Sequence, residues 1–599
     1  MISAGAVVSQ KNTTRSTKVL RLWPAILLVV AFWVFLYFNY NAEMAMTARF
    51  LSRMLAFLIL LFGFLGWWLT RSAISWRDRW QAVAALVLIL IACSLVADKS
   101  VNAFALLLLS LPFIFTTWTL WLYASQWLTP TVKRLGFFLA ILLTVGYFDL
   151  VRSDGLDASQ KPDLSWRWIP SHEAAFLASA ENAKKHPVEQ TEGKPWTPQP
   201  GDCLEYRGPN RDGVATGVSL ATDWKKHPPE LLWRRKVGPA WSGLIVVDGH
   251  LVTQEQRGEK EVVSCYDAKT GDEIWVHDDP IRFEEALAGP GPRATPTFVD
   301  GKIYTYGAKG KLNCLEAATG KVLWSRDCPV DAGVAPADMP QWGYACSPLV
   351  VDGLVVVFTG GANDKSVLAY QATDGKPAWT RAGGKQSYSS PQLITAKGQR
   401  QILMHDNAAL MSLSIPDGEL LWQRSSPSEM SLPMLQPHAA ENDTVVISTE
   451  PGAALLNIKR DGEKWSVDDS WTMNKLRAGF NDFVLSDGCL YGLDDGVLCC
   501  IDLTSGERLW KKGRLGHGQV VFLADQKLMV VSSDKGEVIL VSTNRKGYDE
   551  LGRFQAIEGK TWNGLVIANG ILFLRNGEEM AAYQLSIDPP TKDSAPAAR

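Results

Sequence analysis

The chain has 599 residues, which leaves room for more than one domain, and its formal net charge is −2. Hydrophobic residues make up 47% of it and charged residues 20%, but the long apolar runs are concentrated in residues 1–151. Because no basic stripe runs through the sequence, we expect no nucleic-acid partner.

Five apolar runs in residues 1–151 are each close to the length that crosses a bilayer. Tryptophans such as Trp67 and Trp127 lie at or near their ends, where indole rings prefer the membrane interface. A cleavable signal peptide is an alternative for the first run, but no clean A-x-A site follows it and four more runs do. A soluble helical bundle is the other alternative, but its helices would need a polar face, and runs such as Leu86–Ala92 have almost none. The sequence therefore predicts a five-helix transmembrane domain, with spans at Leu22–Phe38, Met54–Thr70, Gln81–Ala97, Ala103–Tyr123 and Leu135–Val151.

Basic residues predict the orientation of these spans. Lys and Arg cluster before the first span, after the second and before the fifth, whereas the other side holds only Arg49, Arg53 and Lys99. The positive-inside rule then places the N-terminus in the cytoplasm, and five spans place the rest of the chain in the periplasm of a Gram-negative cell. No acid, Lys or His lies near a span centre, so we expect an anchor in the lipid of the inner membrane rather than a transporter.

Residues 152–200 are predicted to be a linker. Ser171 can cap a short helix that has Glu173 in its first turn. The stretch KHPVEQTEGKPWTPQPGD that follows has too many prolines and charges to fold alone. Glu205–Gly213, EYRGPNRDG, is a Pro/Gly turn with two arginines, which could lie across one face of the next domain.

A ten-residue phrase recurs through residues 201–588, and its first copy is YDAKTGDEIW, Tyr266–Trp275. Each copy has a Gly four residues before a Trp. Gly is needed where a hairpin turn requires positive φ. Trp can wedge between two packed layers and still place its single N–H donor. We therefore expect the repeated tryptophans to dock adjacent units: Trp275, Trp324, Trp379, Trp422 and Trp510.

Three independent features of residues 201–588 each occur eight times: a closing aromatic residue, an Asx-Gly-like hairpin turn, and a small or polar cluster before that turn. Four short strands per unit and eight units predict an all-β, eight-bladed propeller. A solenoid is the alternative, but its ends need polar caps. Glu230–Trp233 would complete the last blade, which ends at Tyr583–Leu585. Residues 589–599 are predicted to be a disordered tail.

The phrase A-x-x-T-G-x-x-x-W resembles the tryptophan-docking repeat of the PQQ-like propellers, named after pyrroloquinoline quinone. The resemblance covers Tyr206 to Leu585, and EYRGPNRDG resembles the R-G-P-x-R-x-G segment of membrane-anchored members. The superfamily includes quinoprotein alcohol and glucose dehydrogenases, and also a non-enzymatic lipoprotein propeller that helps assemble outer-membrane proteins. The resemblance is specific for fold and weak for function, because the docking motif joins blades and touches no ligand.

The polar clusters before the first strand of each blade should converge on the propeller axis. They supply the candidate channel and ligand-binding residues Trp241, Arg293, Tyr388, Asn481, His517, Gln519, Trp562 and Asn563. Each of them alone is consistent with the lining of a water-filled channel. Together they could hold a small anionic or polar ligand.

Two functions fit this sequence. The first is a binding or scaffold module at the outer face of the inner membrane, with an unknown protein or small-molecule partner, no cofactor and no metal site. The alternative is a PQQ-dependent dehydrogenase that oxidises a sugar or alcohol and passes electrons to a membrane quinone, because membrane quinoprotein glucose dehydrogenases share this layout. It would need PQQ and Ca²⁺, with Asp482 as the base, Arg293 and Asn481 near the quinone, and Trp241 or Trp562 stacked on it. The blades lack the long insertions that enclose such a cofactor, so the sequence favours the binding module.

The nine cysteines show neither C-x-x-C-H nor a zinc-binding spacing. Most are expected to be core thiols, with room for one bonded pair. The neighbours Cys499 and Cys500 lie inside a repeat strand, where adjacent side chains point to opposite faces, so we expect a structural role for them.

Overall fold

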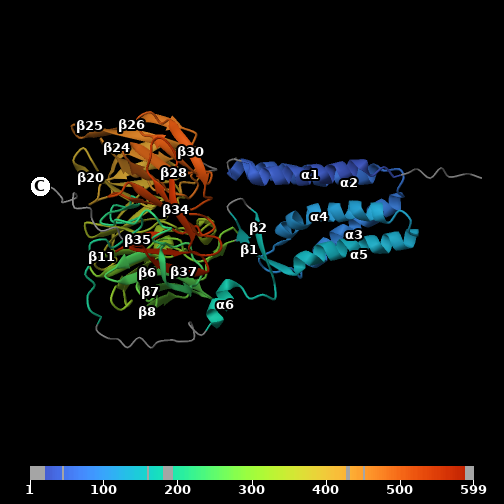
Figure 1. Cartoon of the computed structure of the whole chain (residues 1–599), viewed down its shortest axis with the longest axis horizontal. Coiled ribbons are helices and arrows are strands. Elements are labelled where there is room, and N and C mark those ends of the chain that lie inside the picture. Colours follow the sequence, from blue (N-terminus) through green and yellow to red (C-terminus); the bar gives the residue numbers. More distant parts are fainter. Residues whose placement is uncertain are drawn as a thin grey trace, which may run out of the picture. The chain divides into compact units, whose positions relative to one another are not determined.

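The computed structural model describes residues 20–42, 46–157, 161–179, 193–285, 287–426, 432–449 and 452–586. It divides into two compact units, Met1–Ile169 and Pro170–Arg599. The first unit is mainly helical, and the second is built from small β-sheets (Figure 1).

Long apolar helices form the first unit, followed by a hairpin of β1 (Val151–Leu156) and β2 (Pro162–Trp166). Phe64 and Phe115 stack with ring centroids 4.3 Å apart beside the fully buried Trp118, so aromatic side chains fill the centre of the bundle. The helices are α1 (Trp23–Asn41), α2 (Met46–Thr70), α3 (Trp76–Ser94), α4 (Ala103–Ala124) and α5 (Pro130–Asp149).

Among the described residues, four helices are long and apolar enough to cross a membrane: Trp23–Asn41, Ala48–Thr70, Ala103–Ala124 and Pro130–Asp149. They overlap four of the five predicted spans. The exception is α3, which overlaps the predicted span Gln81–Ala97 but has Arg77, Asp78 and Arg79 in its first turn. A fifth membrane-crossing helix is therefore not shown by length and composition.

Eight four-stranded antiparallel units make the second unit an eight-bladed β-propeller, as predicted (Figure 1). The first four blades are β5–β8 (Ile245–Val247, His250–Arg257, Lys260–Asp267, Glu273–Asp279), β11–β14 (Thr297–Val299, Lys302–Tyr306, Lys311–Glu316, Val322–Asp327), β15–β18 (Leu349–Val351, Leu354–Phe358, Val367–Gln371, Pro377–Arg381) and β19–β22 (Gln392–Ala396, Gln399–His405, Ala409–Leu413, Leu420–Ser425).

The other four blades are β23–β26 (His438–Ala440, Thr444–Ser448, Ala453–Asp461, Lys464–Met473), β27–β30 (Val484–Ser486, Cys489–Asp494, Val497–Asp502, Arg508–Arg514), β31–β34 (Val520–Leu523, Leu528–Ser532, Glu537–Ser542, Glu550–Gln555) and β35–β37 (Val566–Ala568, Ile571–Arg575, Glu579–Gln584) with β4 (Glu230–Lys236). We number them blades 1 to 8 in this order. In blade 8, β37 pairs with β4, which confirms the predicted closure by a strand from the start of the domain.

The first hairpin of most blades has the predicted tight turn. Asp248 and Gly249 have φ of 49° and 77°, and the same pair of positive values occurs at Asp300 and Gly301. Two consecutive positive φ angles define a type I′ turn, which explains the Asx-Gly preference. Blade 7 departs from the pattern: in its turn Lys527 has a φ of 55°.

Short elements lie outside the blades. Helix α6 (His172–Ala178) is capped by Ser171, whose side chain accepts a hydrogen bond from Ala174 N. Glu173 on α6 forms an ion pair with Arg282 (3.0 Å), so part of the predicted linker is attached to blade 1. The remaining elements are β3 (Val214–Ala215), β9 (Glu284–Glu285), β10 (Gly289–Pro290), α8 (Cys328–Ala332) and the 3₁₀ helix η1 (Pro336–Asp338).

The apolar core of the propeller lies between neighbouring blades. Val252 and Cys265 of blade 1 pack with Ile303 and Leu315 of blade 2 in one buried cluster. All nine cysteines are buried free thiols. Cys499 and Cys500 belong to two different clusters, as expected for strand neighbours that point to opposite faces.

Repeat tryptophans join consecutive blades. Trp275 Nε1 donates to Ala317 O of blade 2 (3.0 Å) and Trp324 Nε1 to Ala372 O of blade 3 (3.1 Å). The corresponding donor–acceptor pairs are Trp379 with Ile415 O and the half-buried Trp510 with Asn544 O. Each bond gives the indole N–H an acceptor within the interface between two blades.

Trp422 differs from the other repeat tryptophans. Its Nε1 donates to Gln401 Oε1 of its own blade (3.0 Å). The turn that should receive it, in blade 5, is the end of the longer β25–β26 hairpin, where a Cβ on Gly462 would meet nothing within 4 Å. Because no turn glycine of blade 5 lies against the Trp422 ring, the indole N–H bonds a side-chain oxygen of its own blade instead of a backbone oxygen of the next one.

Candidate functional site at the propeller axis

A segment that precedes the blades crosses the propeller axis. We call residues 203–215 the plug. Cys203 forms a bridge with Val246 of blade 1, and β3 at the far end of the plug pairs in parallel with β31 of blade 7. Between these ends, Arg211 Nη2 donates to Ser347 O of blade 3 (2.9 Å), and Gln392 Nε2 of blade 4 donates to Asn210 O (2.9 Å). The plug therefore contacts the inner strands of blades on opposite sides of the axis.

Buried charges hold the plug in place. Arg211 is 2% exposed and forms an ion pair with Glu205 at 2.9 Å. Burial raises the pKa of the Glu205 carboxyl, and the guanidinium of Arg211 opposes that shift. Gln436 Nε2 of blade 5 also donates to Arg211 O. Because a buried guanidinium is costly without partners, these contacts fix both the course and the depth of the plug.

Asp482, the candidate base, lies under the plug and is 1% exposed. Its Oδ2 is 3.2 Å from Arg207 Nη1 and accepts a hydrogen bond from Tyr206 OH (3.5 Å). Its Oδ1 is 2.6 Å from His438 Nε2 and accepts from Phe483 N. Burial alone would raise the pKa of Asp482, but Arg207 and His438 lower it below its ordinary value. Both carboxylate oxygens are thus engaged in a buried charge network.

Three other predicted axial residues, Asn481, Gln519 and Asn563, join the blades to one another through their side chains. Asn481 Nδ2 donates to Gly518 O (2.6 Å), and the amide of Gln519 donates to Trp562 O (3.3 Å). Such links cross all eight blade interfaces and form a closed belt around the axis: Asn563 to Ser242 O, Ser242 to Ala294 O, Thr295 N to Ser347, Ser347 N to Ser390, Tyr388 N to Pro433 O, His438 with Asp482, Asn481 to Gly518 O and Gln519 to Trp562 O.

Three predicted side chains instead belong to a half-buried aromatic cluster. Trp241 and Trp562 have ring centroids 5.0 Å apart, Phe480 lies 5.0 Å from Trp562, and His517 lies 5.6 Å from Phe480. Lys560 Nζ lies 5.3 Å from the Trp241 ring and 4.8 Å from the Trp562 ring. We call these five residues the aromatic arc. Its indole faces and ammonium group offer cation–π and stacking contacts to a partner.

Arg293 and Tyr388 lie beside the interblade loops of blades 1 to 3. Arg293 forms an ion pair with Glu285 of β9 (3.0 Å) and lies 4.7 Å from the Phe283 ring. Burial lowers the pKa of Arg293, and Glu285 opposes the shift. The Tyr388 hydroxyl accepts from Trp342 N (3.3 Å), and burial raises its pKa. Both side chains are bound by the loops that carry β9, β10, α8 and η1.

Sequence reasoning missed Lys560 and Phe480 as members of the arc. Phe480 opens the cluster FNDF and Lys560 stands two residues before Trp562, so proximity to the predicted clusters was the available signal. Among the described residues, no group of three or more His, Cys, Asp or Glu side chains is placed to hold a metal ion.

Part of the propeller matches the model of a known protein family. Residues 258–512 match the family model described as outer membrane protein assembly factor BamB, a PQQ-type repeat. This match lies within the propeller and covers less than half of the chain. No curated protein matches the chain.

Three solved proteins are similar to this chain at low sequence identity, each with a TM-score below 0.5. BamB from Moraxella catarrhalis is 14% identical, with a TM-score of 0.44 over 60% of this chain and 100% of that one. The quinohemoprotein alcohol dehydrogenase from Comamonas testosteroni is 11% identical, with a TM-score of 0.49 over 72% of this chain and 86% of that one. A europium-containing methanol dehydrogenase is 12% identical, with a TM-score of 0.41 over 65% and 98%.

The residues expected to hold PQQ in this PQQ-like propeller do not fit it as they are placed. Trp241 and Trp562 pack against each other with ring centroids 5.0 Å apart, and Lys560 Nζ lies over both rings, at 5.3 Å and 4.8 Å. Asp482 is engaged with Arg207 and His438 beneath the plug. Asn481 is fully buried, and its amide bonds the backbone of blade 7.

Proposed function

We propose that this protein is a membrane-anchored, non-catalytic PQQ-like propeller that binds a protein or small-molecule partner through the aromatic arc. The proposal places the propeller at the outer face of the inner membrane and the N-terminus in the cytoplasm. It assigns neither nucleic acid nor a cofactor to the protein.

The observation that carries the proposal is the state of Asp482. A general base must reach the proton that it abstracts, and its pKa should lie near the working pH. Asp482 is buried beneath the plug, contacts a guanidinium and an imidazole, and has a lowered pKa. The polar side chains around it bond blade to blade. The half-buried aromatic arc remains as the surface that can meet a partner.

We also propose that α3 is a fifth span. At its start Asp78 forms an ion pair with Arg134 of α5 (2.8 Å). Beyond its end, Arg167 donates both to Val96 O (3.0 Å) and to Asp149 O at the end of α5 (2.9 Å). The two helices therefore run in the same direction, with their first residues at one end of the bundle and their last residues at the other. A bilayer that α5 crosses is then crossed by α3 as well.

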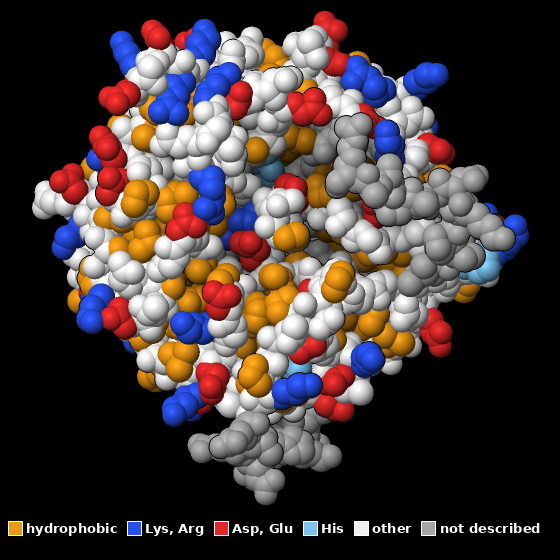
Figure 2. Space-filling model, turned by 90° about the vertical axis from the view of Figure 1, so that its left-hand side faces the viewer, with side chains coloured by type: hydrophobic (Ala, Val, Ile, Leu, Met, Phe, Trp, Pro, Cys, Tyr) orange, Lys and Arg blue, Asp and Glu red, His pale blue; other side chains and the backbone are white. Residues whose placement is uncertain are grey.

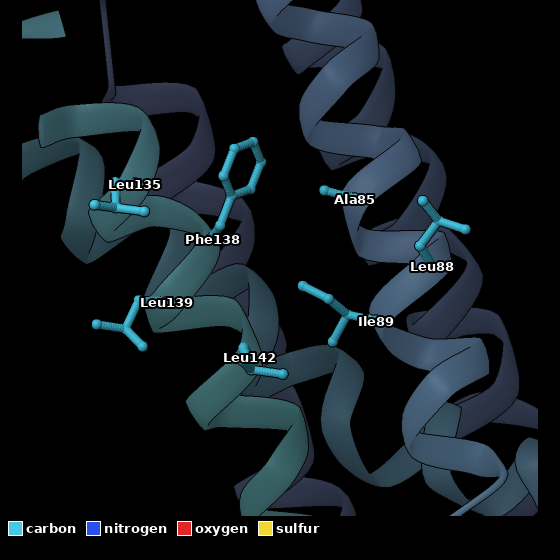
Figure 3. Close-up of a pocket in the computed structure, with 7 residues that line it drawn as sticks. All are labelled: Ala85, Leu88, Ile89, Leu135, Phe138, Leu139 and Leu142. Carbon is cyan, nitrogen blue, oxygen red and sulfur yellow. The ribbon is translucent and has the colours of Figure 1, made fainter. Parts of the chain in front are cut away.

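The groove between α3 and α5 supports the same proposal. It has a volume of about 450 Å³ and is lined only by apolar side chains: Ala85, Leu88, Ile89, Leu135, Phe138, Leu139 and Leu142 (Figure 3). Such a surface suits acyl chains better than water. The charges of the first turn of α3 stay at one end of the bundle, where Arg79 donates to Leu69 O (2.6 Å) and to Ile74 O (2.9 Å).

One face of the propeller carries no dominant charge. Acidic and basic side chains mix over its rim, and neither sign dominates (Figure 2). The net charge of −2 agrees with this distribution.

The test offers the purified full-length protein PQQ and Ca²⁺, then glucose, ethanol and other polyols with an artificial electron acceptor. We expect no turnover in the wild type. PQQ-dependent reduction of the acceptor that disappears in Asp482→Asn, with the thermal midpoint checked because Arg207 loses its charged partner, would establish the dehydrogenase instead.

The binding role is tested in cells with a photoreactive amino acid at Phe480 in the arc and, as the control, at Lys376 in the outer turn of blade 3. We expect one defined partner to be cross-linked from Phe480, to be absent from Lys376, and to be lost when Trp562→Ala is added. Identical products from both positions would contradict an arc-specific contact.

A further inference from the structure

The hairpin β1–β2 follows α5 directly and carries two exposed tryptophans. Trp166 and Trp168 stack with ring centroids 4.9 Å apart and an interplanar angle of 12°. Trp168 is 64% exposed and Trp166 is 36% exposed. The Tyr147 ring, on the last turn of α5, meets the Trp166 ring edge-on at 5.6 Å. Three aromatic rings therefore form one surface at this end of the bundle.

Polar contacts fix that surface relative to the helices. Arg167, between the two tryptophans, lies 3.7 Å from Asp98 and donates to the backbone at the ends of α3 and α5. Ser153 N of β1 donates to Ser100 Oγ, just before α4 (2.9 Å). The hairpin is thus held across the ends of three helices, and its tryptophans keep a set depth along the bundle axis.

The aromatic surface continues an exposed apolar stripe on α5. Leu139, Leu143 and Tyr147 follow one another at four-residue spacing and are 53%, 65% and 47% exposed. Residues at this spacing lie on one helix face. The stripe runs from the middle of α5 to the tryptophan pair. The medium that surrounds the two leucines therefore also reaches the two tryptophans.

We propose that the β1–β2 hairpin is an interfacial anchor whose Trp166 and Trp168 insert into the headgroup layer of a phospholipid bilayer at the end of the bundle where α5 finishes. The inference rests on the proposed membrane anchoring. Continuity with the α5 stripe identifies the occupant as lipid, and indole rings, apolar with one N–H, prefer this layer. The guanidinium of Arg167 donates to backbone carbonyls at the helix ends, so its charge does not have to enter the hydrocarbon layer.

The test places a small environment-sensitive fluorophore on Trp168→Cys in the full-length protein, reconstituted in nanodiscs of phosphatidylethanolamine and phosphatidylglycerol. The nine native cysteines are buried, so the wild type sets the labelling background. Lipids with a nitroxide near the headgroup, lipids with a nitroxide near the chain end, and iodide in water serve as depth quenchers. Leu139→Cys, in the middle of α5, and Val330→Cys, 72% exposed on the propeller, are the matched controls.

We expect the label at Trp168 to be quenched severalfold more by the shallow nitroxide than by iodide or the deep nitroxide. Leu139 should respond most to the deep nitroxide and Val330 to iodide. Quenching at Trp168 by iodide as strong as at Val330, with Leu139 still quenched by lipid, overturns the interfacial anchor and leaves the membrane anchor in place. Loss of lipid quenching at Leu139 overturns both. If Trp168→Cys does not fold, Ile169→Cys, 48% exposed on the same segment, gives the same comparison.

Discussion

Gly320 of blade 2 lies against the indole ring of Trp275 of blade 1, so closely that a Cβ at position 320 would be 2.4 Å from Trp275 Cε3. Gly271 has the same relation to Trp233, and Gly375 to Trp324. The repeat therefore needs Gly for two reasons, a φ of 70° at Gly320 and the approach of the ring. The Gly and the Trp of the repeat phrase act across an interface, each on the partner in the neighbouring blade.

Replacing Gly320 by Ala should destabilise the propeller by roughly 2–5 kcal/mol, because the strain of positive φ adds to a clash with a buried ring. Gly301→Ala is the matched control: its φ is 74°, but its Cβ would meet nothing within 4 Å. We expect about 1–2 kcal/mol there. Thermal and denaturant midpoints of the two variants measure the difference. Equal losses would show that the ring contact contributes nothing.

Trp324→Ala should cost about 3–5 kcal/mol, as for other buried aromatic residues, because the cavity opens between blades 2 and 3 and Ala372 O loses a donor. The neighbouring Leu323 is 46% exposed, and Leu323→Ala should cost less than about 1 kcal/mol. An unchanged thermal midpoint for Trp324→Ala would rule out its docking role.

Arg211→Ala tests the plug. The change leaves Glu205 without its cation and removes one donor from each of the backbone oxygens of Ser347 and Pro348, of which Pro348 O still accepts from Thr297. We expect a loss of about 3–5 kcal/mol, as when one partner of a buried ion pair is removed. Arg400→Ala breaks a pair with Asp352 in which the side chains are 48% and 51% exposed, and should change stability by less than about 1 kcal/mol. Similar small effects in both variants would mean that the plug is dispensable.

Glu261 gives the propeller a pH dependence. Burial raises the pKa of its carboxyl to about 7, above the ordinary 4.5, so the folded state binds the proton more tightly than the unfolded state. The contribution of Glu261 to the free energy of unfolding is fully present below about pH 4.5 and is lost as the pH rises through about 7. Glu261→Gln keeps an acceptor for Ala308 N and removes the titration.

We therefore expect the stability difference between Glu261→Gln and wild type to shift by about 3 kcal/mol in favour of the variant from about pH 4 to about pH 8. Unfolding of both proteins at the two pH values measures it. A constant difference across this range would place the titration elsewhere.

Reporter fusions test the five-span topology. A reporter after Arg599 should be active only outside the cytoplasm, and one inserted beside Arg77 only inside it. Four spans would put a C-terminal reporter on the same side as the N-terminus, so cytoplasmic activity after Arg599 would contradict the proposed span α3.

The fold could be predicted from sequence because its determinants are local and repeated. Asp248-Gly249 specifies a turn through two adjacent backbone angles, and eight such units then close on themselves. The site could not be predicted in the same way. Asp482 meets His438 of the preceding blade and Arg207 of the plug, and no local pattern encodes those pairings. Trp422 shows the limit of the repeat, because its docking position depends on a turn in the next blade that lacks the glycine contact.

The pairing of β37 with β4 has a consequence for biosynthesis. Until Glu579–Gln584 has been made, β4 waits without its partner while the intervening blades form. The nascent protein is then an open ring with two bare sheet edges, a state prone to pairing with other chains. A chain truncated after blade 7 would remain in that state permanently, as an unclosed and aggregation-prone intermediate instead of a smaller propeller.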